Sequence, residues 1–329
     1  MRTFKGLIGN TPMIAIHYRL DGVRNTVYAK LESYNLSGSI KDRMAAHILT
    51  SAEQKGQLRP HQPIVEVTSG NTGIAFAALG ALTKHPVHIF MPDWMSEERK
   101  GLLSMYGAHL HPVSAQEGGF EGALMQAEQA AKDLSAFRPS QFSNQDNPMA
   151  HYLGTGVELL RDLPSITAFT AGVGSGGTIM GVARRLKENR TVHISAIEPD
   201  AVPLLSGGIK KGTHCIEGIG DDFIPDVVDT SLLDGVITVN DMDATAMAAM
   251  LARRLGLGVG ISSGANFLGA ITHQALAEGV TATVFPDDNK KYLTTILSTP
   301  PVLPAWCVSS RVELLGYDVI TSRNIPASI

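Results

Sequence analysis

Short runs rich in branched and aromatic residues alternate with longer alanine-rich runs along most of the chain, and this alternation constrains the fold more than any other feature. The runs that we expect to be strands are 27–31, 63–68, 87–91, 109–113, 168–171, 193–198, 236–239 and 282–285. The runs that we expect to be helices are 39–51, 71–82, 96–106, 119–134, 148–160, 177–187, 241–255 and 264–277. Strands separated by helices of this length form βαβ units, in which the strands pair in parallel and helices cover both faces of the sheet. The sequence therefore predicts an α/β fold with parallel sheets.

The chain has 329 residues, which is long enough for two domains at roughly 150 residues each. A hydrophobic share of 44% and a charged share of 18% supply a sizeable core and exclude a disordered chain. Polar, turn-rich segments favour a small, mobile α/β domain over about 42–160, inserted between the two parts, 1–41 and 161–329, of a larger domain. We expect the proline-containing tail, 299–329, to be less regular.

Charge and cysteine content limit the partners and the compartment. Twenty-seven basic and 31 acidic side chains give a net charge of −4. The sequence has no block of basic residues, so we expect neither nucleic acid nor an anionic membrane as a partner. The two cysteines, Cys215 and Cys307, exclude a disulfide framework and indicate a reducing compartment. No apolar stretch has the length of a membrane span, and residues 1–10 lack the apolar region of a signal peptide. We therefore expect a soluble, cytoplasmic protein.

One polar turn, 35–43, runs into an expected helix and contains a lysine. Lys41 would lie in the first turn of that helix, where the helix dipole disfavours a positive charge. A lowered lysine pKa at this position would make the amine a nucleophile. A solvated helix start explains the same residues, so this segment alone leaves both interpretations open.

A second polar turn, 66–73, follows an expected strand and opens the next helix. Free backbone N–H groups at a helix N-terminus bind carboxylates and phosphates. The side chains that would complete such a cradle are Thr68, Ser69, Asn71 and Thr72. A helix cap requires only one such residue, whereas here five small or polar residues are consecutive, so we favour a ligand site.

A glycine-rich turn, 171–178, again lies between an expected strand and an expected helix. Its backbone could wrap around a phosphate at the start of the helix. The spacing of Gly172, Gly174 and Gly177 also matches the dinucleotide fingerprint, and Glu198 ends the next strand, where a ribose-binding acid would lie. An NAD-dependent oxidoreductase therefore remains open at this point, whereas no lysine of the Walker type follows the glycines.

The remaining polar segments are less specific. The turns 218–222 and 260–264 could approach a ligand, but a surface turn and a helix cap explain them equally well. His109 and His111 alternate along an expected strand, but no second cluster of ligands accompanies them, so we predict no metal site.

An opening segment and five motifs, in this order, resemble those of the cysteine synthase and cystathionine β-synthase family of pyridoxal-phosphate (PLP) enzymes, which have fold-type II and are similar to tryptophan synthase β. The matching segments are Leu7-Ile-Gly-Asn-Thr-Pro12, Ser39-Ile-Lys-Asp-Arg43, Thr68-Ser-Gly-Asn-Thr-Gly73, Gly172–Thr178, Gly218-Ile-Gly220 and Ile261-Ser-Ser-Gly264. The resemblance covers about 7–297 and implies two three-layer αβα domains with mostly parallel sheets, PLP as the cofactor, an amino-acid substrate and a homodimer.

The resemblance also implies roles for individual residues. Lys41 would hold PLP as a Schiff base and then act as the catalytic base, Asn71 would bind the 3-hydroxyl, and Ser262 would face the pyridine nitrogen. The residues that would bind the phosphate are Gly174, Ser175, Gly176, Gly177 and Thr178. The residues that would bind the amino acid are Thr68, Ser69, Thr72, Gln141 and, in the closing loop, Gly218.

This chain departs from the family pattern after Gly-Ile-Gly, where sulfhydrylases usually have a small apolar residue and this sequence has Asp221 and Asp222. An acid on the closing loop near the substrate Cβ suits a base that activates water or a thiol. Asp221 is therefore a second candidate catalytic residue, although an acid on a loop is usually solvated.

The resemblance thus implies an enzyme that replaces the group on Cβ of a serine- or cysteine-type amino acid. The leading hypothesis is synthesis of cysteine from O-acetylserine, or a related donor, and sulfide. The alternative is a lyase that consumes L-cysteine, releases hydrogen sulfide and adds water or a thiol to aminoacrylate. Two rivals from other classes are the NAD-dependent oxidoreductase and a catalytically silent docking protein.

Overall fold

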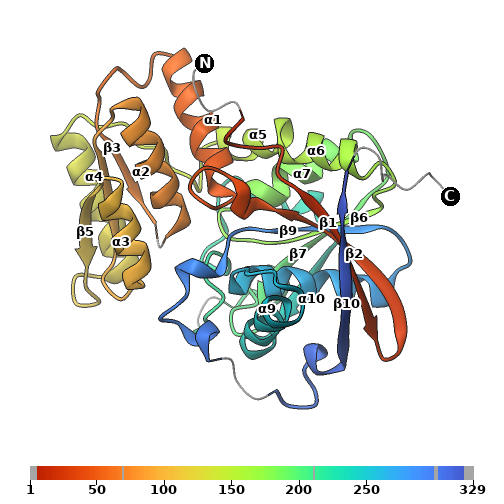
Figure 1. Ribbon diagram of the computed structural model, residues 1–329. Coiled ribbons are helices and arrows are strands. Elements are labelled where there is room, and N and C mark those ends of the chain that lie inside the picture. Colours follow the sequence, from red (N-terminus) through yellow and green to blue (C-terminus); the bar gives the residue numbers. More distant parts are fainter. Residues whose placement is uncertain (1–5, 69, 210–211, 300–302, 322–329) are drawn as a thin grey trace.

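The computed structural model describes residues 6–68, 70–209, 212–299 and 303–321, which form two β-sheets with their helices (Figure 1). One sheet has seven strands and the other has three. Along these ranges, no helix combines the length and the apolar character that a membrane span requires.

The smaller sheet is parallel throughout, in the order β3-β4-β5. Its strands are β3 (Ile64–Val67), β4 (Val87–Pro92) and β5 (His109–Val113). The helices around it are α1 (Lys41–Gln54), α2 (Asn71–Thr83), α3 (Glu97–Met105) and α4 (Gly119–Asp133). Successive side chains of a strand point to opposite faces. Ile64 accordingly packs in a core with α1 and α2, whereas Val65 packs in a second core with α4.

The larger sheet has the order β10-β1-β2-β9-β6-β7-β8. Its strands are β1 (Met13–Leu20), β2 (Val23–Leu31), β6 (Ala168–Gly172), β7 (His193–Pro199), β8 (Gly235–Val239), β9 (Thr281–Phe285) and β10 (Val312–Ile320). Its helices are α5 (Asp146–Leu153), α6 (Thr155–Asp162), α7 (Gly177–Lys187), α8 (Leu204–Gly207), α9 (Asp241–Leu255) and α10 (Ile261–Leu276). The strands from β2 to β8 in this order pair in parallel.

Both faces of the larger sheet are also covered. Ile197 of β7 packs in a core with α9 and α10, whereas its neighbour Ala196 packs in the core of α7 on the opposite face. Each sheet therefore has helices on two faces, and this three-layer αβα arrangement with mostly parallel strands confirms the predicted fold class (Figure 1).

The structure corrects two expectations about single elements. The tail 299–329, expected to be irregular, contains β10, which pairs antiparallel with β1 at the edge of the larger sheet. The expected helix 148–160 is two helices, α5 and α6, which break at Gly154. A Cβ on Gly154 would lie 2.8 Å from the carbonyl oxygen of Ala150 and 3.2 Å from Nη1 of Arg43, so the chain bends where a buried guanidinium approaches it.

The two sheets divide along the sequence. All strands of the smaller sheet lie within 42–160, and all strands of the larger sheet lie outside that range. Helices α5 and α6, which fall at the end of the range, pack against α7 of the larger sheet. The domain boundaries at 42 and 160 remain a prediction.

A buried network of four charged side chains connects α1 to the larger sheet. Arg43 of α1 donates from Nε to Glu32 in the short 3-10 helix Glu32–Tyr34 (2.5 Å) and from Nη1 to Glu158 of α6 (2.6 Å). Lys30 of β2 lies 2.8 Å from the same Glu158 carboxylate. The two buried cations and two buried carboxylates balance, and a third carboxylate, the partly exposed Asp162, lies 3.7 Å from Lys30 at the edge of the network. Such a group is stable in the interior only when every charge is paired. The network fixes the position of α1 two residues after Lys41.

We predict that Glu158→Ala lowers the free energy of unfolding by roughly 3–5 kcal/mol, because it leaves Lys30 and Arg43 buried without their shared carboxylate. Burial raises the pKa of Glu158, but the hydrogen bonds and charges of Arg43 and Lys30 outweigh burial and hold this pKa well below its usual range. This contribution is therefore fully present above the usual glutamate pKa and is lost as the pH falls towards the lowered value.

Urea denaturation at several pH values measures this effect. The control is Glu128→Ala, which breaks an exposed pair with Lys132 on α4 and should change stability little. Equal losses in the two variants would contradict a structural role for the network.

Candidate active site

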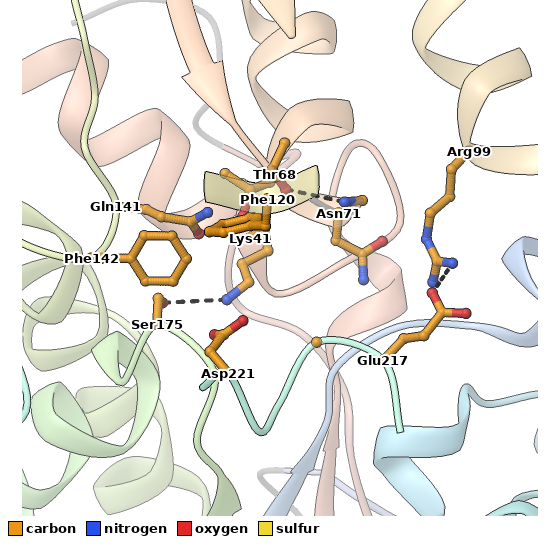
Figure 2. Close-up of a pocket in the computed structure, with 13 residues that line it drawn as sticks. Lys41, Thr68, Asn71, Arg99, Phe120, Gln141, Phe142, Ser175, Glu217 and Asp221 are labelled. Carbon is orange, nitrogen blue, oxygen red and sulfur yellow. Dashed lines mark hydrogen bonds and ion pairs between the residues drawn. The ribbon is translucent and has the colours of Figure 1, made fainter. Parts of the chain in front are cut away.

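The candidate site lies where segments that follow parallel strands of both sheets meet, which is the usual position of ligands in α/β proteins. Two adjoining cavities open there. The residues that line both cavities are Lys41, Asn71, Ser175, Glu217 and Gly218. Figure 2 shows the Lys41 side chain in the centre of the site, with Ser175 and Asp221 below it.

Lys41 is the first residue of α1 and extends into both cavities. Its Nζ lies 3.5 Å from Oγ of Ser175, in the loop before α7. Burial lowers the pKa of the Lys41 amine, and the nearby carboxylate of Asp221 opposes this effect. A lysine with a lowered pKa is neutral more often, and the neutral amine is both a nucleophile and a base.

The turn between β3 and α2 forms one wall of the first cavity. Thr72 donates from Oγ1 to Oε1 of Gln141 (2.7 Å), and Gly70 donates its N–H to Oγ1 of Thr68 (3.1 Å). Thr68, Thr72 and Gln141 are all buried and line the cavity at the N-terminus of α2. The predicted residue Ser69 lies outside the described residues. This wall has the free N–H groups and hydroxyls that bind a carboxylate.

The glycine loop before α7 forms a wall of the second cavity. Gly176 has φ +80°, a conformation that favours glycine, and a Cβ there would collide with Val228. A Cβ on Gly174 would collide with the carbonyl group of Gly218. The glycine loop is therefore in direct contact with residues 217–223, which we call the closing loop. Gly177 packs on Asn147 and does not line the cavity.

Other walls of the second cavity hold two polar side chains. Ser262 is buried in the first turn of α10. Asn71 donates from Nδ2 to Asp287 (2.7 Å), but its buried Oδ1 has no hydrogen-bond partner among the described residues. A buried polar atom without a partner is costly, so Oδ1 indicates a bound group that would satisfy it. The glycine cradle, the amine of Lys41 and this amide together fit a phosphorylated aldehyde such as PLP.

Asp221 and Lys41 are brought together although 180 positions separate them in the sequence. Figure 2 shows the carboxylate of Asp221 pointing towards the Lys41 amine. Burial raises the pKa of Asp221, the charge of Lys41 opposes this effect, and Asp222 adds to it. The neighbouring Asp222 is exposed.

Glu198 is not free to bind the ribose of a dinucleotide. Its carboxylate accepts hydrogen bonds from the backbone N–H of Leu205 (2.7 Å) and Ser206 (3.0 Å) and from the Ser206 hydroxyl (2.5 Å). Glu198 thus caps the short helix α8. The acid that suggested a ribose contact is occupied, which argues against the NAD-dependent interpretation.

Several residues of the site were not predicted. Arg99 of α3 is 2% exposed and pairs with Glu217 of the closing loop (Figure 2). Its Cζ lies 4.8 Å from the ring centre of Tyr292. Phe120 and Phe142 line the first cavity. Asp287, which holds Asn71, follows β9 and could have been found because ligands gather at the carboxyl ends of parallel strands. The other residues carry no local sequence signal.

Comparison with known proteins agrees with this geometry. Residues 4–287 match the family described as "Pyridoxal-phosphate dependent enzyme". Cysteine synthase from Staphylococcus aureus is 41% identical over 296 residues, which cover 88% of this chain and 95% of that protein.

Solved structures with the same fold include a hydrogen sulfide-producing enzyme and a cysteine synthase. A hydrogen sulfide-producing enzyme from Fusobacterium nucleatum has a TM-score of 0.92 and 48% identity, over 94% of this chain and 95% of that one. An aspartate-to-asparagine variant of that enzyme was solved with an α-aminoacrylate intermediate. Cysteine synthase from Entamoeba histolytica has a TM-score of 0.86 and 32% identity, over 94% of this chain and 95% of that one. These matches confirm PLP as the cofactor, and the chain belongs to the family of pyridoxal-phosphate dependent enzymes.

Proposed function

We propose that this protein consumes L-cysteine, releases hydrogen sulfide and adds water to Cβ. The chain is a PLP-dependent enzyme of the β-replacement and β-elimination type in sulfur metabolism, so the question is which direction it favours. The observation that carries the proposal is the carboxylate of Asp221 facing the amine of Lys41 in the first cavity. The direction proposed is the alternative of the two that the sequence suggested.

The binding roles follow from the walls of the two cavities. We assign the α-carboxylate of the substrate to Thr68, Thr72, Gln141 and the N–H groups at the start of α2. Gly218 would lie over the substrate in the closing loop. The cofactor phosphate is assigned to the glycine loop, at the lining residues Gly174, Ser175, Gly176 and Thr178 and at the N–H of Gly177, the first residue of α7. The ring is assigned to the space between Asn71 and Ser262.

Lys41 and Ser262 set the first half of the reaction. When bound, PLP supplies a ring that withdraws electrons from Cα. Lys41 removes the α-proton at Nζ, which its lowered pKa allows. The hydroxyl of Ser262 does not impose a full positive charge on the ring, so electron withdrawal is weaker than an aspartate would cause. Prompt loss of the group on Cβ is then favoured over reactions that need a long-lived carbanion.

Asp221 acts in the second half. The Cβ–sulfur bond breaks, and the sulfur leaves as hydrosulfide with the bonding electron pair and takes up one proton from solvent, which Asp221 replaces when it passes on the proton it later takes from water. Water then forms a bond to Cβ and gives a proton to Asp221, and Lys41 returns the α-proton, so that cysteine and water yield serine and hydrogen sulfide. The carboxylate also repels hydrosulfide, which opposes the reverse use of sulfide as the nucleophile. The Fusobacterium variant with asparagine in place of an aspartate holds α-aminoacrylate, which supports a role for an aspartate after this point in that enzyme.

Synthesis of cysteine from O-acetylserine and sulfide is the second candidate. It is favoured by the 41% identity to cysteine synthase of Staphylococcus aureus. A homodimer in the cytoplasm, which the resemblance implies, also remains part of the proposal.

Replacement of the anchor lysine tests the site as a whole. Lys41→Ala should remove the visible absorption of the covalently held cofactor and stop turnover, because no other amine lies at this junction among the residues lining either cavity. The exposed Lys132→Ala should keep both. If Lys41→Ala retains the absorption band and full activity, another lysine holds the cofactor.

Replacement in the glycine loop tests the phosphate site. Gly176→Asp places a carboxylate against the phosphate and a side chain against Val228, so cofactor content per chain should fall several-fold. Gly256→Asp is the matched control, since Gly256 has a similar φ of +71° but open space around its Cα and lies outside the cavities. Cofactor content that is equal in the two variants would remove this loop from the site.

Asp221→Asn tests the direction of the reaction. The variant should keep the cofactor and release sulfide from cysteine in its first turnover, but form serine about 100- to 10,000-fold more slowly, because it lacks the general base. Stopped-flow spectra and product analysis measure the two steps separately. The exposed neighbour provides the control, Asp222→Asn, which should behave as the wild type. Serine formation by Asp221→Asn at the wild-type rate would make cysteine synthesis the better interpretation.

A further inference from the structure

Three phenylalanines from separate segments meet beside Asp221, and we call them the aromatic wall. Phe120 lies in the first turn of α4, Phe142 follows Gln141, and Phe223 follows the two acids of the closing loop. The ring centres of Phe120 and Phe142 are 6.2 Å apart at an interplanar angle of 81°. Those of Phe142 and Phe223 are 4.9 Å apart at 72°. Both are edge-to-face pairs, a geometry that holds rings in place.

The aromatic wall faces the part of the first cavity that the other roles leave free. Among the lining residues, Lys41, Asn71 and Ser175 are assigned to the cofactor, and the turn at the start of α2 with Gln141 is assigned to the substrate carboxylate. The remaining side chains are Phe120, Phe142, Asp221 and the ion pair of Arg99 with Glu217. The group on Cβ and the incoming nucleophile must therefore lie among these residues. This step rests on the proposed function.

The chemistry of these side chains discriminates between nucleophiles. The aromatic faces of Phe120 and Phe142 offer no hydrogen-bond partner to a polar group. A second amino acid would bring an ammonium and a carboxylate, whose burial is costly without partners. The guanidinium of Arg99 is already paired with Glu217. Water needs little space and finds its hydrogen-bond acceptor in Asp221.

We propose that the aromatic wall of Phe120, Phe142 and Phe223 selects the nucleophile, because it admits water beside Asp221 and excludes thiols by their size and charge. Phe120 and Phe142 line the cavity and act on the nucleophile directly. Phe223 is a positioning residue, since it packs on Phe142 and lies outside the lining of this cavity.

The test is the ratio of thioether to serine formed by the holoenzyme from cysteine and added 2-mercaptoethanol. Phe142→Ala and Phe120→Ala should each raise this ratio by at least about tenfold, since even one methylene group in an apolar pocket is worth about 10- to 200-fold in discrimination. Phe223→Ala should raise it by less. A loss of folded protein lowers both products equally and leaves the ratio unchanged, so the ratio reports the wall and not stability.

Two controls define the cause. Phe137→Ala removes a partly buried ring outside both cavities and should keep the wild-type ratio. With homocysteine, which carries an ammonium and a carboxylate, each substitution should raise the ratio of thioether to serine less than it does with 2-mercaptoethanol. An equal rise in the ratio would overturn the part of the proposal that concerns charge. Calorimetry measures binding of the purified thioether formed with 2-mercaptoethanol. This thioether should bind more tightly to Phe142→Ala than to the wild type.

The same ratio is measured with O-acetylserine in place of cysteine. An enzyme that releases no sulfide from cysteine overturns the proposed function, but water and thiol still compete for the same Cβ when O-acetylserine is the donor. A ratio that stays at the wild-type value in both Phe142→Ala and Phe120→Ala, with either donor, overturns the selection by the aromatic wall.

Discussion

The pairing of Arg43 with Glu32 and Glu158 is the contact on which the rest of the site depends. It ties α1 to the larger sheet while the same helix packs against α2 of the smaller sheet. Lys41, the first residue of α1, enters both cavities at the junction of the two sheets. Buried ion pairs tolerate little displacement because each unpaired charge is costly, so the network holds the reactive amine in place.

Close backbone contact links the remaining parts of the site to each other. Gly174 of the glycine loop lies against the carbonyl group of Gly218, and Glu217 beside it pairs with Arg99 of α3. The closing loop therefore contacts a loop of the larger sheet and a helix of the smaller one. Any displacement of the closing loop would move Asp221, which follows three residues after Gly218, relative to Lys41.

Sequence patterns predicted those parts of the site that lie in a turn between a strand and the helix that follows it. Lys41, Asn71 and the glycines before α7 lie in such turns, and the structure brings them to one junction. Strand β1 forms a hairpin with β2 across Asp21-Gly22, a local signal that the sequence analysis did not use. Strand β10 could not be predicted in the same way, because its pairing with β1 joins distant parts of the chain. For the same reason, the contact of Arg99 with Glu217 had no signal in the sequence.

Incubation of the purified holoenzyme with L-cysteine alone, and separately with O-acetylserine and sulfide, tests the central claim most directly. Serine, cysteine and sulfide are quantified in both reactions, and kcat/KM is compared between the two. The account predicts a higher kcat/KM for cysteine, with serine and hydrogen sulfide formed in equal amounts. Faster formation of cysteine from O-acetylserine, with no sulfide released from cysteine, would contradict it.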